Sequence, residues 1–395
     1  MGDPIAAIAI DGGELPLGGG LLALVRPALD ALQPGGLLAI LSRAPGLRQD
    51  LPSWCRSERH DYVGVETIDG GDRHLIARGR FSVPTVTESS PLPAHADPAS
   101  GFAPRGARLE PGRPSYPFTL NDRDHVAPPE VGRLYEQAAG AQWDATRDVP
   151  WDRVRELPPA LDAALGQVMT FLAENELSAL YLPSRFVARV HPVYVETAMF
   201  LASQLADEAR HIDVFLRRAR LCRGGLGVSA SATARSLLSL LTIDDFTEAA
   251  FLLSVLGEGT FLDLLAFIER HAPDDATAEL VRRARQDESR HVHFGLAHVR
   301  HGLATDPTLF DRLEDAVRRR AAALHDVGGV PAPVQDALTI LAAGEAAPRA
   351  VARGHERFRE LLETMHASRM KRLEHAGFSP EQADRISRLH TPNFM

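Results

Sequence analysis

Two short strings, ADEARH at 206–211 and QDESRH at 286–291, decide the interpretation of this sequence of 395 residues. Each string places a glutamate three residues before a histidine. On a helix, such residues lie on one face about one turn apart, so both side chains can reach the same metal ion. A lone Glu-x-x-His match arises by chance, but the longer pattern Asp-Glu-x-Arg-His is much rarer, and it occurs twice. The strings therefore predict four metal ligands: Glu208, His211, Glu288 and His291.

The partner carboxylate of the first string is expected on the helix that precedes it. Glu176 precedes Glu208 by 32 residues, and the midpoint is Pro192. Proline after a helix end marks the turn of an antiparallel hairpin, and equal arms bring Glu176 and Glu208 to one level. Glu174 is close by but points about 200° away from Glu176 on a helix, so only one of the two faces inward. The spacing slightly favours Glu176.

Glu258 is the corresponding candidate for the second string. It precedes Glu288 by 30 residues, and the midpoint is again a proline, Pro273. Glu258 lies in the otherwise apolar stretch FLLSVLGEGTFLDLLAFI, where an unpaired carboxylate costs several kcal/mol. An ion pair with a buried arginine is the structural alternative. Four carboxylates with two neutral imidazoles match the charge of two divalent cations, which favours a dinuclear site.

Charged residues flank the predicted ligands in both strings. Asp207 and Asp287 each precede the histidine of their own string by four residues. Each is expected to accept a hydrogen bond from the non-ligating nitrogen of that imidazole, which fixes its tautomer and ring plane. Arg210 and Arg290 can in turn pair with these aspartates, and surface ion pairing is the alternative. A third Glu-x-x-His match, at 363–366, is interpreted as a solvated helix face.

The chain divides into three parts of different composition. Residues 1–82 alternate strand-like and helix-like patterns in the order β-α-β-α-β-β, which indicates a small α/β sandwich. Residues 83–130 are rich in Pro, Ser, Ala and Gly, as in a linker or surface strap. Residues 131–395 are almost wholly helical in pattern, with a bundle core expected at about 160–303. The predicted fold is mainly α, a ferritin-like four-helix bundle with extra C-terminal helices after a small α/β domain.

Composition argues against several classes of protein. The net charge of −9 and pI of about 6.0 leave no basic surplus for phosphates, so nucleic acid is not an expected partner. Neither Cys55 nor Cys222 has a second thiol at metal-ligand spacing. The start lacks a basic n-region, and no uncharged apolar run reaches about 18 residues, so we expect no signal peptide, no membrane span and a cytoplasmic location.

FLAENE (171–176), ADEARH, LGEGTF (256–261) and QDESRH together resemble the hydroxylase subunits of bacterial multicomponent di-iron monooxygenases. They are also similar to ribonucleotide reductase small subunits and arylamine N-oxygenases, over about residues 130–305. In the hydroxylase pattern the first ligand lies five residues after the phenylalanine of an FLxxxE string, which selects Glu176. The resemblance implies a dinuclear iron site, O2 as oxidant, and electrons from a separate reductase or ferredoxin.

Three positions depart from these families. The hydroxylase subunits carry a threonine four residues after the third carboxylate, where this chain has Leu262. Ribonucleotide reductase subunits carry a radical tyrosine four residues after the first histidine, where Phe215 stands. Arylamine N-oxygenases place an extra histidine four residues before the last glutamate, where Ala284 stands. The chain is therefore similar to the superfamily and departs from the pattern of each branch.

The amino-terminal part, residues 5–80, resembles a TusA/SirA-type sulfur-carrier domain, most clearly in LLALVRPALDALQPGGLLAILSRAPGLRQDLPSWC (21–55). The Cys-Pro-x-Pro nucleophile of that family falls near Gly18 and is absent. Cys55 lies on the predicted second helix, where a small packed residue is the simpler interpretation. We therefore expect a degenerate carrier domain that serves docking or architecture.

These patterns predict an O2-dependent non-haem di-iron oxidoreductase, an oxidase or oxygenase that acts on a small organic substrate. A Mn/Fe ligand-binding oxidase would use the same ligands, because carboxylate-rich sites accept both metals. Iron storage or a structural metal site is the non-catalytic alternative, and a homodimer is left open as the assembly. The residues expected to line an apolar substrate pocket lie one turn from the ligands: Ala173, Ala179, Gln204, Phe215, Ser254 and Leu262.

Overall fold

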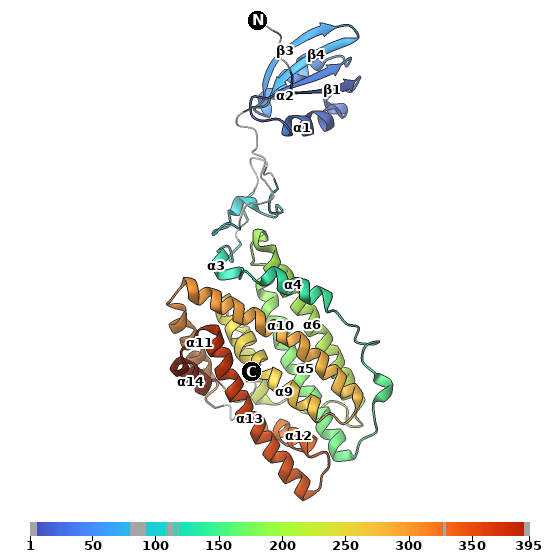
Figure 1. Ribbon diagram of the computed structural model, residues 1–395. Helices are drawn as coiled ribbons and strands as arrows, with labels where there is room; N and C mark the ends of the chain where they lie inside the picture. The colour runs from blue at the N-terminus through green and yellow to red at the C-terminus, as the bar shows by residue number, and fades with distance from the viewer. Residues whose placement is uncertain are drawn as a thin grey trace. The chain divides into compact units, whose positions relative to one another are not determined.

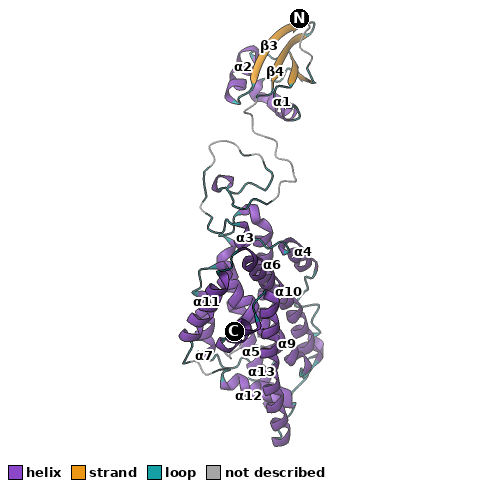
Figure 2. Ribbon diagram, turned by 60° about the vertical axis from the view of Figure 1, so that its left-hand side comes forward, coloured by secondary structure: helices purple, strands orange, loops and turns teal. Residues whose placement is uncertain are grey.

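Helix dominates the structure (Figures 1 and 2). The computed structural model describes the following residues: 6–79, 92–107, 109, 114–116, 118–326 and 329–390. The chain forms two compact units, each with a hydrophobic core of its own. The smaller unit comprises Met1–Pro91 with Ala103–Pro114, and the larger comprises Leu92–Phe102 with Ser115–Met395.

The smaller unit has the predicted element order. Its elements are β1 (Ile8–Gly13), η1 (Leu17–Gly19), α1 (Leu21–Asp30), β2 (Leu37–Ser42), α2 (Leu47–Ser57), β3 (Asp61–Ile68) and β4 (Gly71–Ala77). The sheet order is β1-β2-β4-β3, with β1 parallel to β2 and the other pairs antiparallel. Val25 of α1, Leu51 of α2 and Ile40 of β2 are fully buried in one core. The sequence-based expectation of a small α/β sandwich is confirmed.

The larger unit is helical. Its amino-terminal elements are η2 (Pro98–Ser100), α3 (Arg123–Val126), α4 (Val131–Gly140), η3 (Trp151–Arg153), α5 (Pro159–Val187), η4 (Pro192–Tyr194), α6 (Val195–Arg220) and α7 (Ser231–Leu241). The elements that follow are α8 (Phe246–Ala250), η5 (Phe251–Glu258), α9 (Gly259–Arg270), α10 (Asp275–Thr305), α11 (Leu309–Ala323), α12 (Ala332–Ala343), α13 (Pro348–Ala376) and α14 (Pro380–Leu389). The label η5 denotes a π-helix.

Four long helical segments form the bundle: α5, α6, the continuous stretch from α8 through η5 to α9, and α10 (Figure 1). Both predicted hairpins are confirmed, because Pro192 lies between α5 and α6 and Pro273 between α9 and α10. Helices α11 to α14 are the extra C-terminal helices, and α12 and α13 pack against α5 and α9. The mainly α, ferritin-like bundle with a small sheet unit is therefore the observed fold.

Part of the predicted linker lies on the bundle as a strap. The linker's residues 83–91 lie outside the described chain, whereas Leu92–Phe102 belongs to the larger unit. Ala96 is fully buried, and its N–H donates to the carbonyl oxygen of Asn121 at 2.8 Å. The Tyr194 hydroxyl donates to the carbonyl oxygen of Pro93 at 3.0 Å. The first contact ties the strap to the segment before α3, and the second ties it to η4, between α5 and α6.

One helical stretch, Phe246–Arg270, is long and apolar enough to cross a membrane by length and composition alone. In its most apolar window, 83% of the residues are buried inside the protein. Burial in the bundle core therefore accounts for its composition. This stretch also carries Glu258, so its single buried acid is enclosed by apolar side chains.

Candidate metal centre

The four bundle segments bring all six predicted ligands together at one level. Glu176 comes from α5, Glu258 from the last residue of η5, and each of α6 and α10 supplies a glutamate and a histidine. All six residues are at most 2% exposed. Together they form two groups that can each hold a metal ion: Glu176, Glu208, His211 and Glu288 in the first, and Glu208, Glu258, Glu288 and His291 in the second.

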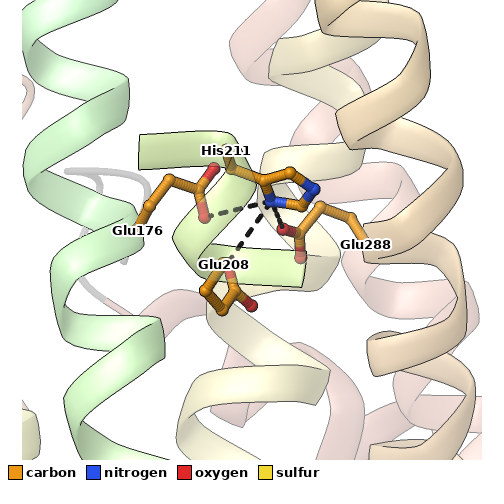
Figure 3. A group of neighbouring side chains, drawn as sticks. All are labelled: Glu176, Glu208, His211 and Glu288. Carbon is orange, nitrogen blue, oxygen red and sulfur yellow. Dashed lines mark ion pairs between the residues drawn. The ribbon is translucent and has the colours of Figure 1, made fainter. Parts of the chain in front are cut away.

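The first group converges on one imidazole nitrogen (Figure 3). The Nδ1 atom of His211 lies 3.7 Å from Glu176 Oε2, 3.4 Å from Glu208 Oε2 and 3.3 Å from Glu288 Oε1. These atoms come from three different helices and point at a common space. One nitrogen and three carboxylate oxygens in this arrangement form a hard, mixed N/O ligand set.

The second group repeats this arrangement around His291. Its Nδ1 atom lies 3.1 Å from Glu208 Oε1 and 3.4 Å from Glu288 Oε2. Glu208 and Glu288 thus each direct one oxygen toward His211 and the other toward His291. We call these two residues the shared carboxylates. A carboxylate with its oxygens divided between two imidazoles has the geometry of a bridge between two cations.

The ligand atoms lack hydrogen-bond partners, although they are buried. Both oxygens of each shared carboxylate, Oε1 of Glu176, Oε2 of Glu258 and the Nδ1 atoms of both histidines make no hydrogen bond. Buried polar atoms are normally satisfied, and leaving several of them unpaired in one place is costly. Two divalent cations would supply the missing partners and balance the four negative charges. The donor set therefore fits a dinuclear metal site.

Electrostatics in the cluster also favour a cation. Burial, followed by repulsion from the shared carboxylates, raises the pKa of Glu176 well above its usual value, and the same two causes act on Glu258. Burial alone would lower the pKa of His211, but its hydrogen bond to Asp287 and the nearby glutamate carboxylates raise it well above 6.5. Burial would also lower the pKa of His291, but the charges of the shared carboxylates raise it well above 6.5. Without metal, the folded cluster therefore holds protons that cations would displace.

The aspartates pair with the histidines crosswise. The Nε2 atom of His211 lies 3.1 Å from Asp287 Oδ2, and that of His291 lies 3.3 Å from Asp207 Oδ2. The expectation that each aspartate serves the histidine of its own string was therefore wrong. Because Nδ1 of each ring points into the cluster, Nε2 points across to the opposite helix and reaches the aspartate there. This crossing ties α6 to α10.

The two arginines link both aspartates. Arg210 pairs with Asp207 through a short contact and lies 3.5 Å from Asp287 Oδ2. Arg290 pairs closely with Asp287 and lies 3.4 Å from Asp207 Oδ2. The four side chains form an alternating ring of charges, with both aspartates buried. Such a ring holds each aspartate in its charged, accepting state and so orients both imidazoles.

Gln142 and Trp143, which lie between α4 and η3, contact the same ring of charges. The sequence did not predict them. The indole N–H of Trp143 donates to Asp287 Oδ2 at 2.7 Å, and the Gln142 amide donates to Asp207 Oδ1 at 3.2 Å. Trp143 also stacks on His211, with ring centroids 6.5 Å apart and planes 20° apart. Nothing in the local pattern QWD indicates this role, because the contacts cross more than 60 residues of sequence.

A small apolar pocket adjoins Glu258. The Gln204 amide donates to Glu258 Oε1 at 3.0 Å, and Gln204 and Ser254 are the polar members of the pocket lining. The pocket volume is about 20 Å³, close to the space of one water. Its apolar lining comes from α5, α6, α8, η5 and α10: Leu182, Pro183, Phe186, Leu201, Phe246, Ala249, Ala250, Leu253 and Phe294.

The other predicted pocket residues lie elsewhere. Ala173, Ala179 and Phe215 are buried in the bundle core and are not among the pocket-lining residues. Leu262 is only half-buried, and it is among neither the described core residues nor the residues that line this pocket. Leu262 lies in the regular helix α9, which begins directly after Glu258. Thr260 is turned away as well, toward α13 and α14.

The π-helix needs a close neighbour without a side chain. Gly295 of α10 lies opposite η5, and a Cβ atom at this position would approach Ser254 Cβ to 2.7 Å. Real Cβ contacts are longer than this, so any larger residue would push η5 away from α10. Gly295 thereby allows the two segments that carry Glu258 and Glu288 to pack closely.

The remaining sequence candidates are also placed. Glu174 is half-buried and lies outside both ligand groups, and burial raises its pKa. Glu363 and His366 are both exposed on α13, and neither belongs to a described metal-ligand group. The placement of this third Glu-x-x-His match agrees with the solvated helix face expected for it.

Comparison with known proteins gives only distant similarity. No family model matches the chain, and no curated protein matches it. A variant R2-like ligand-binding oxidase with an aerobically reconstituted Mn/Fe cofactor is 16% identical, with a TM-score of 0.43, and covers 67% of this chain and 94% of its own. Another variant, with an anaerobically reconstituted Mn/Fe cofactor, is 16% identical with a TM-score of 0.45, and covers 62% and 92%. At these values the similarity carries no argument about the metal, substrate or reaction of this chain.

Proposed function

We propose that the bundle binds two metal ions, as an iron pair, and uses them to activate dioxygen for the oxidation of a small organic substrate. The observation that carries the proposal is the division of the oxygens of both shared carboxylates between His211 and His291. Imidazole and carboxylate ligands without thiolate suit iron and manganese, so a manganese–iron pair is the alternative metal content.

The chain's own residues have distinct tasks in this proposal. A bound dinuclear site of this type supplies the electrons and open coordination positions that dioxygen reduction requires. Asp207 and Asp287 hold the imidazoles in one tautomer, and the two arginines keep these aspartates charged. Gln204 orients the Glu258 carboxylate through one oxygen and leaves the other oxygen free for a cation. A separate reductase or ferredoxin would deliver the electrons.

The pocket beside Glu258 supports an apolar substrate. Nine of its eleven lining residues are apolar, and the two polar ones, Gln204 and Ser254, lie at its ligand side. A pocket of about 20 Å³ holds no more than about one water. A substrate therefore enters only as the lining side chains adjust, which favours a small or narrow apolar molecule.

Anaerobic reconstitution of the full-length protein with ferrous iron tests the proposal. We expect two ions per chain, followed by oxygen uptake and a change in visible absorption when O2 is admitted. Glu258→Ala should bind fewer ions and consume less O2. Two tightly bound ions without oxygen uptake would contradict an oxidase and leave a structural site, and large cages on size-exclusion chromatography would indicate storage instead.

The amino-terminal unit supports a TusA-like domain that no longer carries sulfur. Gly18 lies in η1, where the carrier nucleophile is expected, and has no thiol. Cys55 is fully buried in α2, and burial raises the pKa of its thiol to about 12. A buried, protonated thiol is a poor nucleophile, so persulfide carriage by Cys55 is not part of the proposed function.

A further inference from the structure

A second cavity, remote in sequence from the ligand strings, lies where α9, α13 and α14 meet. It has a volume of about 250 Å³. We call it the α13–α14 pocket. Its lining includes Leu362, Met365 and Arg369 from α13, Ser387 and Arg388 from α14, and His390. None of its described lining residues is acidic. The pocket lining thus combines cationic and apolar side chains.

Arg369 is the buried cation of the pocket lining. It is 8% exposed, and its hydrogen bonds run from Nη1 to the carbonyl oxygen and hydroxyl of Ser387, both at 3.2 Å. Its Nε atom is buried without a partner, and within the described chain no carboxylate forms an ion pair with it. Burial lowers its pKa to about 10, so the guanidinium stays charged at neutral pH. A buried charge without a counter-ion is costly.

The surroundings add donors and positive charge. The Nε2 atom of His390 is buried without a partner, and Arg372 has two unpaired buried nitrogens. Arg372 lies 3.5 Å from the Asp263 carboxylate, which also accepts from Ser368. Burial, and then the charges of nearby arginines, lowers the pKa of His390 well below 6.5, so that imidazole is neutral. The cluster therefore has more cationic groups and donors than described acceptors.

We propose that the α13–α14 pocket binds the oxyanion of a small molecule, a carboxylate or a phosphate, with Arg369 as its charged partner. An anion placed there would receive the unused guanidinium donors, and charge-assisted hydrogen bonds of this kind are the strong ones. The Ser387 hydroxyl lies 2.9 Å from His366 Nδ1, so a second hydrogen-bonding pair borders the same space. Leu362 and Met365 would contact the apolar part of the molecule.

The pocket is separate from the metal ligands but connected to the segment that carries one of them. Thr260 lines the pocket, and its hydroxyl donates to the carbonyl oxygen of Leu256 in η5 at 2.6 Å. Glu258 lies between these two residues. The proposal rests on the pocket's own residues and not on the proposed oxidation, so each can fail without the other.

Thermal unfolding of the full chain tests the site with two probes, inorganic phosphate and propionate, at constant ionic strength against chloride. We expect a saturable rise in Tm with at least one probe. Arg369→Met should weaken the apparent affinity by about tenfold or more, because charged hydrogen bonds are lost. Arg369→Lys keeps the charge without the planar guanidinium, so its apparent affinity should lie between those of the wild type and Arg369→Met. Arg359→Met, an exposed position on the same helix, should match the wild type.

The Met variant is expected to fold, since removing an unpaired buried charge leaves stability equal or higher in anion-free buffer. The responses to the two probes identify the oxyanion: a shift with phosphate alone indicates a phosphate group, and a shift with propionate alone indicates a carboxylate. A linear, unsaturated rise that is equal in wild type and Arg369→Met would reflect general salt exclusion and overturn the proposal. The absence of any shift with both probes would overturn it as well.

Discussion

The two halves of the candidate metal centre place equivalent side chains in different surroundings. On the His211 side, the aspartate behind the ring also accepts from Trp143, and Glu176 comes from a regular stretch of α5. On the His291 side, Glu258 ends a π-helix, and Gln204 binds it at the wall of an apolar pocket. The duplicated strings therefore supply four of the six candidate ligands, while other segments supply the remaining two and determine the surroundings of each half.

This difference assigns separate tasks to the two halves. The aromatic ring of Trp143 stacks on His211. The guanidinium carbons of Arg210 and Arg283 lie over the Trp143 ring, 5.2 and 5.6 Å from its centroid. That side is closed by packing and by cation–π contacts. The Glu258 side combines an unusual helix with a cavity, and π-helical segments are frequent at functional sites. We therefore expect substrate to approach from the Glu258 side.

Removing a shared carboxylate should have the largest effect, because it affects both halves. Glu288→Ala is expected to abolish binding of both ions, whereas Glu176→Ala should impair the His211 half and leave partial occupancy. Metal analysis per chain after reconstitution measures the difference. Glu174→Ala is the matched control, since Glu174 is on the same helix but outside both ligand groups. Full occupancy in Glu288→Ala would refute the bridging assignment.

Metal removal should lower the free energy of unfolding by several kcal/mol, because it leaves buried charges unpaired. The loss should grow with pH. The raised pKa values of Glu176, Glu258, His211 and His291 mean that the folded metal-free chain binds more protons than the unfolded chain. The stability of the metal-free chain therefore falls as the pH rises above 4.5 and 6.5, the ordinary pKa values of glutamate and histidine.

Melting curves of metal-free and metal-loaded protein between about pH 6 and 9 measure this effect, a window set by the ordinary histidine value. The Tm of the metal-free protein should fall with rising pH, and the loaded protein should change less. The carboxylates whose pKa is lowered, Asp207, Glu208 and Asp287, change the stability only at more acidic pH, so they do not reverse the fall in Tm with rising pH. Parallel curves for the two forms would show that the cluster holds no extra protons.

Gln204→Leu should lower the metal affinity of the His291 half alone. It removes the hydrogen bond to Glu258 and keeps a similar side-chain volume, so packing of the pocket is retained. Loss of a group that orients a ligand typically costs about 10- to 100-fold in metal affinity. We expect this loss for one ion only, with the His211 half unchanged. Equal weakening of both ions in competition titrations would mean that Gln204 acts on the whole bundle.

The sequence predicted which side chains the bundle brings together, because helical spacing is a local property. Residues three apart share a helix face whatever surrounds them, so Glu208 and His211 were identified from their own string. The crossed aspartate pairing depends on which helices face each other, and no local pattern contains that information. Trp143 reaches Asp287 across 144 residues, for the same reason. Leu262 is only half-buried although it follows Glu258 by one regular turn of α9, because burial depends on which helices pack against that face.

The smallest effect is expected for Trp143→Phe, which tests whether the closed side of the centre matters for metal binding. The change removes one hydrogen bond to Asp287 and keeps most of the aromatic contact with His211. A hydrogen bond to a charged group is worth about 1.5–3 kcal/mol. Asp287 retains its contacts with His211 and both arginines, so we expect a loss below about tenfold in affinity for the ion on that side.

Tryptophan fluorescence gives this last prediction a specific readout. Because Trp143 stacks on a ligand ring, iron binding should quench its emission in the wild type. The quench should be lost in Trp143→Phe and retained in Trp151→Phe, whose indole donates to the carbonyl oxygen of Ala145 instead. A full quench in Trp143→Phe would place the nearest ion away from His211. A loss of affinity as large as that of Gln204→Leu would mean that the closed side positions the metals as strongly as the side that faces the pocket.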